Sequence, residues 1–137
     1  RNNIHFYDDY AHHPTEIKVV LEGIKKVYND YEKVCIFQPH RISRLKDLRR
    51  EFSFAFKDAD TVLLCPIYSA GEKIKLGFNY LNFAKEIIKN SKVKLFLVND
   101  NIQLAKFLKN YVNGKKIVIG MGAGSISNWM KELPQLM

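Results

Sequence analysis

Two arginines spaced three residues apart, Arg41 and Arg44, are the side chains in this sequence best suited to bind an anion. They follow Pro39, which ends an apolar run typical of a strand, and they precede a segment with helical spacing. Guanidinium groups beside the N-terminus of a helix form a strong anion site, because the helix dipole and two planar forks of donors act together. A plainer interpretation stays open, in which both arginines lie on the surface and pair with Asp47 or Glu51.

A second polar group lies near the N-terminus, where the carboxylates of Asp8 and Asp9 are followed by His12 and His13. Carboxylates and imidazoles are metal ligands, but adjacent histidines are awkward for one ion and no third cluster completes a shell. We therefore expect no metal site. A carboxylate at the end of a strand more often accepts from a sugar hydroxyl or caps the next helix, and the sequence alone does not separate these roles.

A glycine-rich segment, residues 120–124, follows a strand-like run and precedes a helix. It matches the dinucleotide-binding fingerprint poorly, because Ser125 stands where that pattern needs glycine and no acidic ribose ligand follows on a further strand. We interpret the glycines as positions where the backbone approaches a ligand or a neighbouring helix closely. The sequence also lacks the glycine-rich phosphate loop, so this chain by itself cannot cradle ATP in that way.

The elements that would position these residues alternate between strand and helix along the chain. Strands are predicted at residues 4–8, 33–38, 61–65, 93–98 and 116–119. Helices are predicted from Pro14 or Thr15, from a capping Ser43 unbroken through Phe56, from Asn79, from Asn101 and after Gly124. Their apolar spacing predicts inward-facing side chains that include Ile17, Leu21, Val27, Leu81 and Ile102.

This alternation predicts an α/β fold, a Rossmann-like three-layer domain with a mostly parallel sheet of five or six strands and helices on both faces. The carboxyl ends of parallel strands meet at one edge, where sheets of this kind bind ligands. Most of the unusual polar residues fall in four loops at that edge: residues 9–13, 39–44, 68–72 and 121–125. We therefore predict one site there.

The composition is that of a single globular domain, with 137 residues of which 47% are hydrophobic and 26% charged. No run reaches the roughly 20 apolar residues of a membrane-spanning helix. The N-terminus carries no signal-peptide core. It lacks an initiator Met and enters a strand almost at once, which suggests a piece of a longer protein. Cys35 and Cys65 lie in apolar segments, which favours buried free thiols and a reducing cytoplasm. The net charge of +8 is spread over the amphipathic segments without a recognition motif for nucleic acid.

Residues 8–16 (DDYAHHPTE) resemble the opening of the C-terminal domain in the Mur ligase family. Residues 37–44 (FQPHRISR) resemble a second signature, that of the alanine-adding members, the UDP-N-acetylmuramate–L-alanine ligases of the MurC type. The segments YSAGE and GAG fall where those members have similar loops. The resemblance covers residues 1–137 as an amino-acid-binding, closing domain. It departs at Ile42, where the family usually has an aromatic residue, and at Ser125, where Asp or Asn is common.

The resemblance implies a reaction and a role for each site residue. In this family ATP phosphorylates the lactate carboxylate of UDP-N-acetylmuramate, and the amine of L-alanine attacks the acyl phosphate. By resemblance, Asp9 contacts the ATP ribose. The alanine would be surrounded by Tyr10, His12, His40, Arg41 and Arg44. ATP and magnesium would be bound mainly by a central domain, which is missing from this chain together with an N-terminal UDP-sugar domain.

The resemblance therefore predicts the C-terminal domain of a cytoplasmic ligase in peptidoglycan precursor synthesis, inactive without the rest of its chain. Its partners would be small-molecule substrates and the missing domains, and neither nucleic acid nor a membrane. Two other functions remain open. One is a stand-alone Rossmann-like module that binds a nucleotide or another anion, and the other is a basic domain that binds nucleic acid with strong salt dependence.

Overall fold

A parallel five-stranded sheet forms the centre of the computed structural model, which describes residues 4–68, 79–111 and 113–137. The strands are β1 (Ile4–Asp9), β2 (Glu32–Phe37), β3 (Thr61–Leu64), β4 (Lys94–Leu97) and β5 (Lys116–Met121). They lie in the order β1-β5-β2-β3-β4, so β5 pairs with both β1 and β2. The predicted α/β class is confirmed, with five strands in the described sheet.

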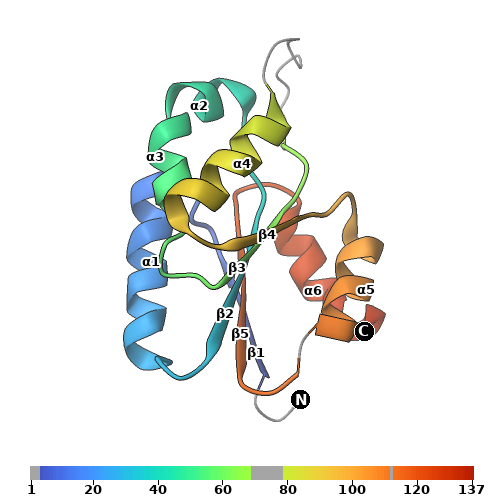
Figure 1. The fold of residues 1–137 in the computed structure, drawn as a ribbon. Coiled ribbons are helices and arrows are strands. Elements are labelled where there is room, and N and C mark those ends of the chain that lie inside the picture. The colour runs from blue at the N-terminus through green and yellow to red at the C-terminus, as the bar shows by residue number, and fades with distance from the viewer. Residues whose placement is uncertain (1–3, 69–78, 112) are drawn as a thin grey trace.

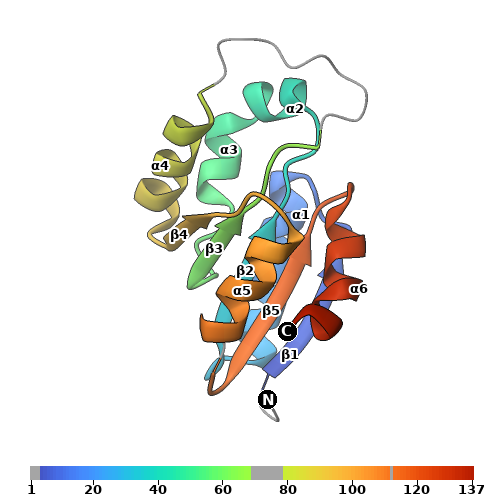
Figure 2. The same ribbon diagram turned by 90° about the vertical axis from the view of Figure 1, so that its right-hand side faces the viewer.

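Helices cover both faces of this sheet (Figure 1). They are α1 (Pro14–Val27), α2 (Ile42–Asp47), α3 (Arg49–Phe54), α4 (Tyr80–Ser91), α5 (Asn101–Tyr111) and α6 (Ile126–Leu136). Helices α1, α3 and α4 lie on one face and α5 and α6 on the other, and Figure 2 looks onto the sheet from the side of α5 and α6. None of the helices described is long and apolar enough to cross a membrane.

Two apolar cores hold the three layers together, one on each face of the sheet. Successive residues of β2 alternate between these cores: Cys35 and Phe37 belong to the one shared with α1, α3 and α4, whereas Val34 and Ile36 belong to the one shared with α5 and α6. A strand that is buried on both faces reads as an unbroken apolar run, which is why β2 was predictable from the sequence.

Four of the apolar residues that helical spacing predicts to face inward are exposed instead. The accessible fractions are 73% for Val27, 54% for Leu81, 43% for Ile88 and 58% for Ile102, whereas Ile17 is buried as predicted. All four lie in the first or last turn of their helices. Helical spacing fixes the direction in which a side chain points but not whether another element lies there to cover it.

The helix predicted over residues 43–56 is wrong in two respects. Its first part, α2, begins at Ile42, with Arg41 rather than Ser43 in the N-cap position and no capping hydrogen bond from the Arg41 side chain. Leu48 has φ −113° and ψ 20°, outside the helical region, and divides the segment into α2 and α3. Both short helices bury residues in the same core, so the apolar spacing continues across the break and did not reveal it.

The two cysteines are buried free thiols, as predicted. Cys35 belongs to the core beneath α1 and Cys65 to the core beneath α5 and α6, so the two side chains point to opposite faces of the sheet. Burial raises the pKa of both thiols, that of Cys65 to about 12. Neither thiol is therefore suited to act as a nucleophile at neutral pH, because the thiolate is the reactive form.

Candidate functional site

The loops that follow β1, β2 and β5 are tied together at the carboxyl edge of the sheet. The N–H of Gly122 donates to the carbonyl of Asp9 at 3.3 Å, and the N–H of Gln38 donates to the carbonyl of Met121 at 3.0 Å. These bonds extend the β1–β5 and β2–β5 pairings one step beyond the strands. The ends of the three strands are therefore held at one level.

The loop after β3 joins this edge from the other side of β2. The N–H of Tyr68 donates to the carbonyl of Pro39 at 2.8 Å, and the N–H of Arg41 donates to the carbonyl of Tyr68 at 2.8 Å. His40 and Tyr68 form a parallel bridge between the two loops. The predicted loop at residues 68–72 is described only at Tyr68, and residues 69–72 lie outside the described residues.

Four aromatic rings from three of these loops form a row across the edge. The rings of Tyr10 and His12 meet edge to face with 5.6 Å between centroids, and those of His12 and His40 do so at 5.8 Å. His40 then stacks on Tyr68 at 5.6 Å, with 17° between the ring planes. The row brings together three residues predicted to bind alanine, Tyr10, His12 and His40. Tyr68 was not among the predicted site residues, although its loop was.

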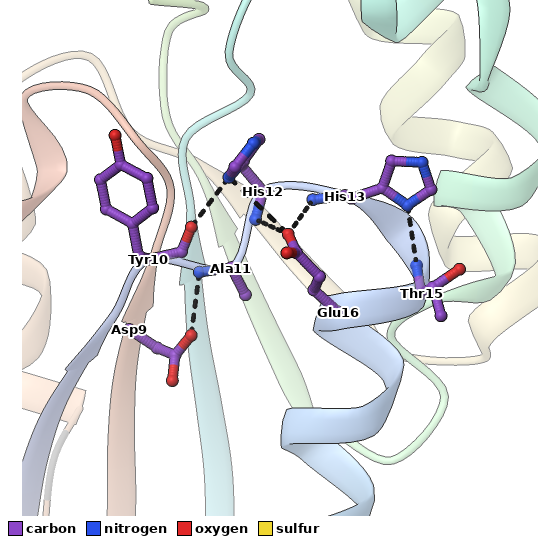
Figure 3. A network of polar contacts seen from close by, with 7 residues as sticks. All are labelled: Asp9, Tyr10, Ala11, His12, His13, Thr15 and Glu16. Carbon is purple, nitrogen blue, oxygen red and sulfur yellow. Dashed lines mark hydrogen bonds and ion pairs between the residues drawn. The ribbon is translucent and has the colours of Figure 1, made fainter.

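Asp9 shapes the loop after β1 and does not cap a helix. Its Oδ1 accepts a hydrogen bond from the N–H of Ala11 at 2.8 Å (Figure 3), and His12 Nδ1 lies 2.9 Å from the Tyr10 carbonyl oxygen. Of the two roles that the sequence left open, capping is therefore excluded for Asp9. Among residues 4–68, 79–111 and 113–137 nothing bonds to its second oxygen, Oδ2, which leaves that oxygen available to a ligand.

Glu16 completes the cap of α1 and holds the loop that carries His12. Its Oε1 accepts from the N–H groups of His12 at 3.2 Å and His13 at 3.1 Å, while His13 Nδ1 accepts from the N–H of Thr15 at 3.4 Å (Figure 3). The hydrogen bond from the His12 N–H, followed by that from His13, lowers the pKa of the Glu16 carboxyl. Our sequence reasoning missed this cap. Its signal was an acidic residue three positions after the cap, with His in place of Ser or Thr.

Arg41 and Arg44 flank the start of α2 at the same edge. Arg41 has φ 69° and ψ 130°, a backbone conformation that costs a non-glycine residue about 1–3 kcal/mol. Arg44 is half-buried, and its Nη1 is buried without a hydrogen-bond partner in the part of the chain that the structure describes. In that same part neither arginine forms an ion pair with Asp47 or Glu51. The surface-pair interpretation is therefore wrong for the described residues.

Two glycines let the turn after β5 lie against the end of β2. Gly122 has φ 148°, and a Cβ there would lie 2.8 Å from the Gln38 carbonyl oxygen and 2.9 Å from Ile126 Cγ2. A Cβ on Gly124 would collide with the ring of Tyr68 and lie 2.8 Å from Gln38 Oε1. The close approach predicted for these glycines is thus to two neighbouring loops as well as to α6. Sequence reasoning missed Gln38, whose only signal was a polar residue at the end of an apolar strand.

The acidic and histidine residues near the N-terminus do not assemble into a metal site. Nowhere in the described segments do three or more His, Cys, Asp or Glu side chains group so that they could hold a metal ion. Asp8 is engaged by Ser127, whose hydroxyl donates to Asp8 Oδ2 at 2.6 Å, and the rings of His12 and His13 lie apart in Figure 3. What this edge offers is a guanidinium group, a row of rings and a carboxylate oxygen, which suit recognition of a small polar ligand.

Comparison with known proteins identifies relatives over nearly the whole chain. The family model described as Mur ligase, glutamate ligase domain, matches residues 1–124. The chain is 70% identical over 131 residues to the UDP-N-acetylmuramate–L-alanine ligase of Pelagibacter ubique, and 36% identical over 132 residues to that of Bartonella bacilliformis. Each alignment covers 96% of this chain but 28% of the relative. The chain thus spans little more than a quarter of the length of these relatives.

Solved structures share the fold. The crystal structure of UDP-N-acetylmuramate–alanine ligase MurC from Thermotoga maritima matches with a TM-score of 0.75 and 27% identity, covering 97% of this chain and 26% of that one. A murein peptide ligase from Psychrobacter arcticus matches with a TM-score of 0.75 and 19% identity, covering 98% of this chain and 28% of that one. The second likeness shows the fold alone.

Proposed function

The chain belongs to the Mur ligase family, and on that premise we propose that it is the C-terminal domain of a longer ligase that uses ATP to add L-alanine to UDP-N-acetylmuramate. The curated relatives carry the ligase name and extend well beyond the matched part. The chain has no phosphate loop of its own. ATP phosphates and magnesium would therefore be held mainly by a central domain, and the UDP-sugar by an N-terminal domain, both outside residues 1–137.

The proposed reaction has two steps and belongs to peptidoglycan precursor synthesis. ATP phosphorylates the lactate carboxylate of the UDP-sugar and leaves as ADP, and the alanine amine then attacks the acyl phosphate and releases phosphate. The domain would hold the alanine and close over the other domains. Closure brings the amine to the acyl phosphate and excludes water that would otherwise hydrolyse it.

The observation that carries this proposal is the buried Nη1 of Arg44, which finds no hydrogen-bond partner among the described residues. A buried donor left unsatisfied costs about 1–3 kcal/mol, and more when it is charged. The carboxylate of a bound amino acid would remove that cost by accepting the hydrogen bond. Alanine needs such a contact, because burying its methyl group supplies only about 1 kcal/mol.

The other predicted site residues have roles consistent with this placement. Tyr10, His12 and His40 would line the alanine site through the aromatic row, and Arg41 would add a second guanidinium at its border. Asp9 would accept a hydrogen bond from the ATP ribose at Oδ2, since Oδ1 already accepts from Ala11. The proposed location is the cytoplasm, where buried free thiols stay reduced.

A stand-alone module that binds a nucleotide or another anion is the alternative, and the same Arg44 nitrogen supports it. The two functions differ in one requirement. The ligase domain must be joined to a segment with a phosphate loop, and residues 1–137 on their own should then show no alanine-dependent release of phosphate. Such release from the purified 137-residue chain would contradict the proposal that ATP phosphates and the UDP-sugar are bound by other domains.

Replacing Arg44 with Lys in the full-length protein tests the alanine site. The substitution keeps the charge but loses the planar fork. We expect alanine efficiency, kcat/KM, to fall roughly tenfold or more, while the KM values for ATP and the UDP-sugar barely change. Steady-state kinetics with each substrate varied in turn measures this. Arg50→Lys on α3, an exposed arginine over the Phe54 ring, is the matched control and should change none of the three values. If Arg44→Lys and Arg41→Lys both leave alanine efficiency unchanged, the alanine site lies elsewhere.

Replacing Asp9 with Ala tests the proposed ribose contact. The variant loses a charge-assisted hydrogen bond worth on the order of 1.5–3 kcal/mol, so the KM for ATP should rise at least tenfold while the KM for alanine changes less. Asp8→Ala is the matched control, because it removes a neighbouring carboxylate that bonds only to Ser127 among the described residues. A collapse of alanine use with unchanged ATP use in Asp9→Ala would show that the carboxylate serves the other ligand.

A further inference from the structure

We propose that Gln38 is a positioning residue of this site, which fixes the turn after β5 against the loop that carries His40 and Arg41. Gln38 itself is buried, with 4% of its surface accessible, and reaches no open part of the edge. Its effect on alanine binding rests on the proposed function.

The carboxamide of Gln38 makes two hydrogen bonds to the turn after β5. Its Nε2 donates to Ser125 Oγ at 2.8 Å, and its Oε1 accepts from the N–H of Ile126 at 3.0 Å. Because a backbone N–H can only donate, the atom that faces Ile126 must be the oxygen, and the orientation of the amide is thereby fixed. The main chain of Gln38 holds the same turn, since its N–H donates to the Met121 carbonyl at 3.0 Å.

Gln38 supplies a hydrogen-bond acceptor at the start of α6, where the N-cap residue of the helix does not. Ser125 occupies the N-cap position of α6, but its side chain makes no capping hydrogen bond. The first turn of a helix has N–H groups without partners in the helix, and a side chain from another element can satisfy one of them. Gln38 does so for Ile126 from the end of β2. The start of α6 is therefore tied to a different strand rather than to its own sequence.

The hydrogen bonds from Gln38 to Ser125 and Ile126 are connected by further contacts to the predicted alanine-binding residues. Gly124 lies so close to both Gln38 Oε1 and the Tyr68 ring that no Cβ fits there. The Tyr68 ring stacks on His40, and the Tyr68 carbonyl accepts the N–H of Arg41. If the carboxamide of Gln38 is lost, the turn is free to shift, and Tyr68 loses the surface against which it holds His40 and Arg41.

An apolar residue at position 38 would fill a similar volume but could not form the two hydrogen bonds. Leu at position 38 would leave the Ile126 N–H buried without an acceptor, which is costly. Glu at position 38 would keep an acceptor for Ile126 and could accept from the Ser125 hydroxyl, which rotates freely. Gln38→Leu and Gln38→Glu therefore separate the hydrogen bonds from the volume of the side chain.

Kinetics and hydrogen exchange of the full-length protein test the inference together. For Gln38→Leu we expect the KM for alanine to rise about tenfold, since small displacements of a substrate-holding group have effects of this size or larger. The KM for ATP should stay within about twofold, and Gln38→Glu should restore the alanine KM to within about threefold of the original. Hydrogen exchange at the Ile126 amide, followed by mass spectrometry, should accelerate in Gln38→Leu and not in Gln38→Glu.

Three further variants complete the design. Ser125→Ala removes one of the two bonds with little risk to folding and should raise the alanine KM less than Gln38→Leu. The double variant should match Gln38→Leu alone, because both substitutions act on one contact. Gln135→Leu, at an exposed position of α6, is the matched control and should change nothing.

The inference is overturned if Gln38→Leu leaves Ile126 exchange unchanged. It is also overturned if exchange accelerates while the KM values for alanine and ATP stay constant or change in parallel, since Gln38 would then serve stability alone. If the full-length wild-type protein showed no alanine-dependent phosphate release, the proposed function would be refuted instead. The exchange data would still show whether Gln38 holds the Ile126 amide.

Discussion

The charged side chains at the two edges of the sheet differ in whether they are paired within the chain. At the amino edge, Lys116 Nζ donates to Glu32 Oε1 at 2.6 Å and the Tyr111 hydroxyl donates to Glu32 Oε2 at 2.9 Å. At the carboxyl edge, Arg44 has a buried nitrogen with no partner among the described residues, and Arg41 has a strained backbone. The first arrangement pairs its charges within the folded chain, whereas the second leaves a buried donor without a partner among the described residues.

A hollow in the surface does not by itself mark the edge that has the unpaired polar group. A hollow of about 670 Å³ lies at the amino edge, lined by residues 29–33, 60–61 and 92–94. Its lining carries charges of both signs, and Glu32 within it is already paired with Lys116. Arg44, whose buried nitrogen lacks a partner among the described residues, is not part of the lining of this hollow.

The largest effect is expected from Gly122→Ala, which would show that the carboxyl edge is tightly packed as well as polar. The new Cβ meets the Gln38 carbonyl oxygen and Ile126 Cγ2, and φ 148° disfavours any side chain. The free energy of unfolding should fall by about 3 kcal/mol, which lowers the melting temperature by on the order of 10 °C in a chain of this size. Urea titration and thermal unfolding measure both.

Gly23→Ala is the matched control for that substitution. Gly23 lies within α1, and a Cβ there would have no neighbouring atom within 4 Å. Alanine should stabilise the helix by about 0.5–1 kcal/mol. If Gly122→Ala is as harmless as Gly23→Ala, the turn after β5 does not pack against β2 in solution.

A smaller effect is expected from Lys116→Met at the amino edge. The variant leaves the Glu32 carboxylate without its cation, and the free energy of unfolding should fall by about 2 kcal/mol, less than for a fully buried pair because Glu32 is a third exposed. Alanine kinetics should not change. Lys115→Met, which removes the exposed pair with Asp30 and a cation–π contact with the Tyr31 ring, should cost much less than Lys116→Met. Equal losses in the two variants would mean that the Lys116–Glu32 pair acts as a surface ion pair.

The same pair predicts how the difference depends on pH. Burial of Glu32 raises the pKa of its carboxyl, but the hydrogen bonds from Lys116 and Tyr111 outweigh burial and hold that pKa below its usual value. A lowered pKa contributes stability above the unfolded value of about 4.3, and this contribution is lost as the pH falls through the folded value. The stability deficit of Lys116→Met should therefore be full at neutral pH and shrink in acid.

The smallest change in the free energy of unfolding is expected from Arg41→Gly, which should raise stability while lowering alanine efficiency. Glycine removes the strain of φ 69° but adds chain entropy, so the net gain in the free energy of unfolding should be about 1 kcal/mol. Alanine efficiency should fall, because a guanidinium is lost. Lys92→Gly, at the left-handed C-cap of α4, is the control: it should also stabilise the chain but leave the kinetics unchanged. A loss of stability in Arg41→Gly would mean that the backbone there is not strained.

The sequence was sufficient for the sheet but not for the contacts that shape the site. Strands β2, β3 and β5 are buried on both faces and read as apolar runs, and the rule for parallel sheets then places their loops together. The bonds from Gln38 to Ser125 and Ile126, by contrast, join residues 87 and 88 positions apart, and no local pattern marks them. The positive φ of Arg41 has the same origin, since its N–H is held by the carbonyl of a distant Tyr68.

Strand β5 lies between β1 and β2 although it follows both in the sequence, and β1 pairs with no other strand of the described sheet. As the ribosome releases the chain from its N-terminus, β1 has no neighbour in the sheet until residues 116–121 emerge. Pairings between such distant segments form slowly, so closure of the sheet belongs to the late stages of folding. The bond from Gly122 to Asp9 forms only then. A nascent chain therefore cannot form the complete carboxyl edge early, because that edge is completed only together with the last strand.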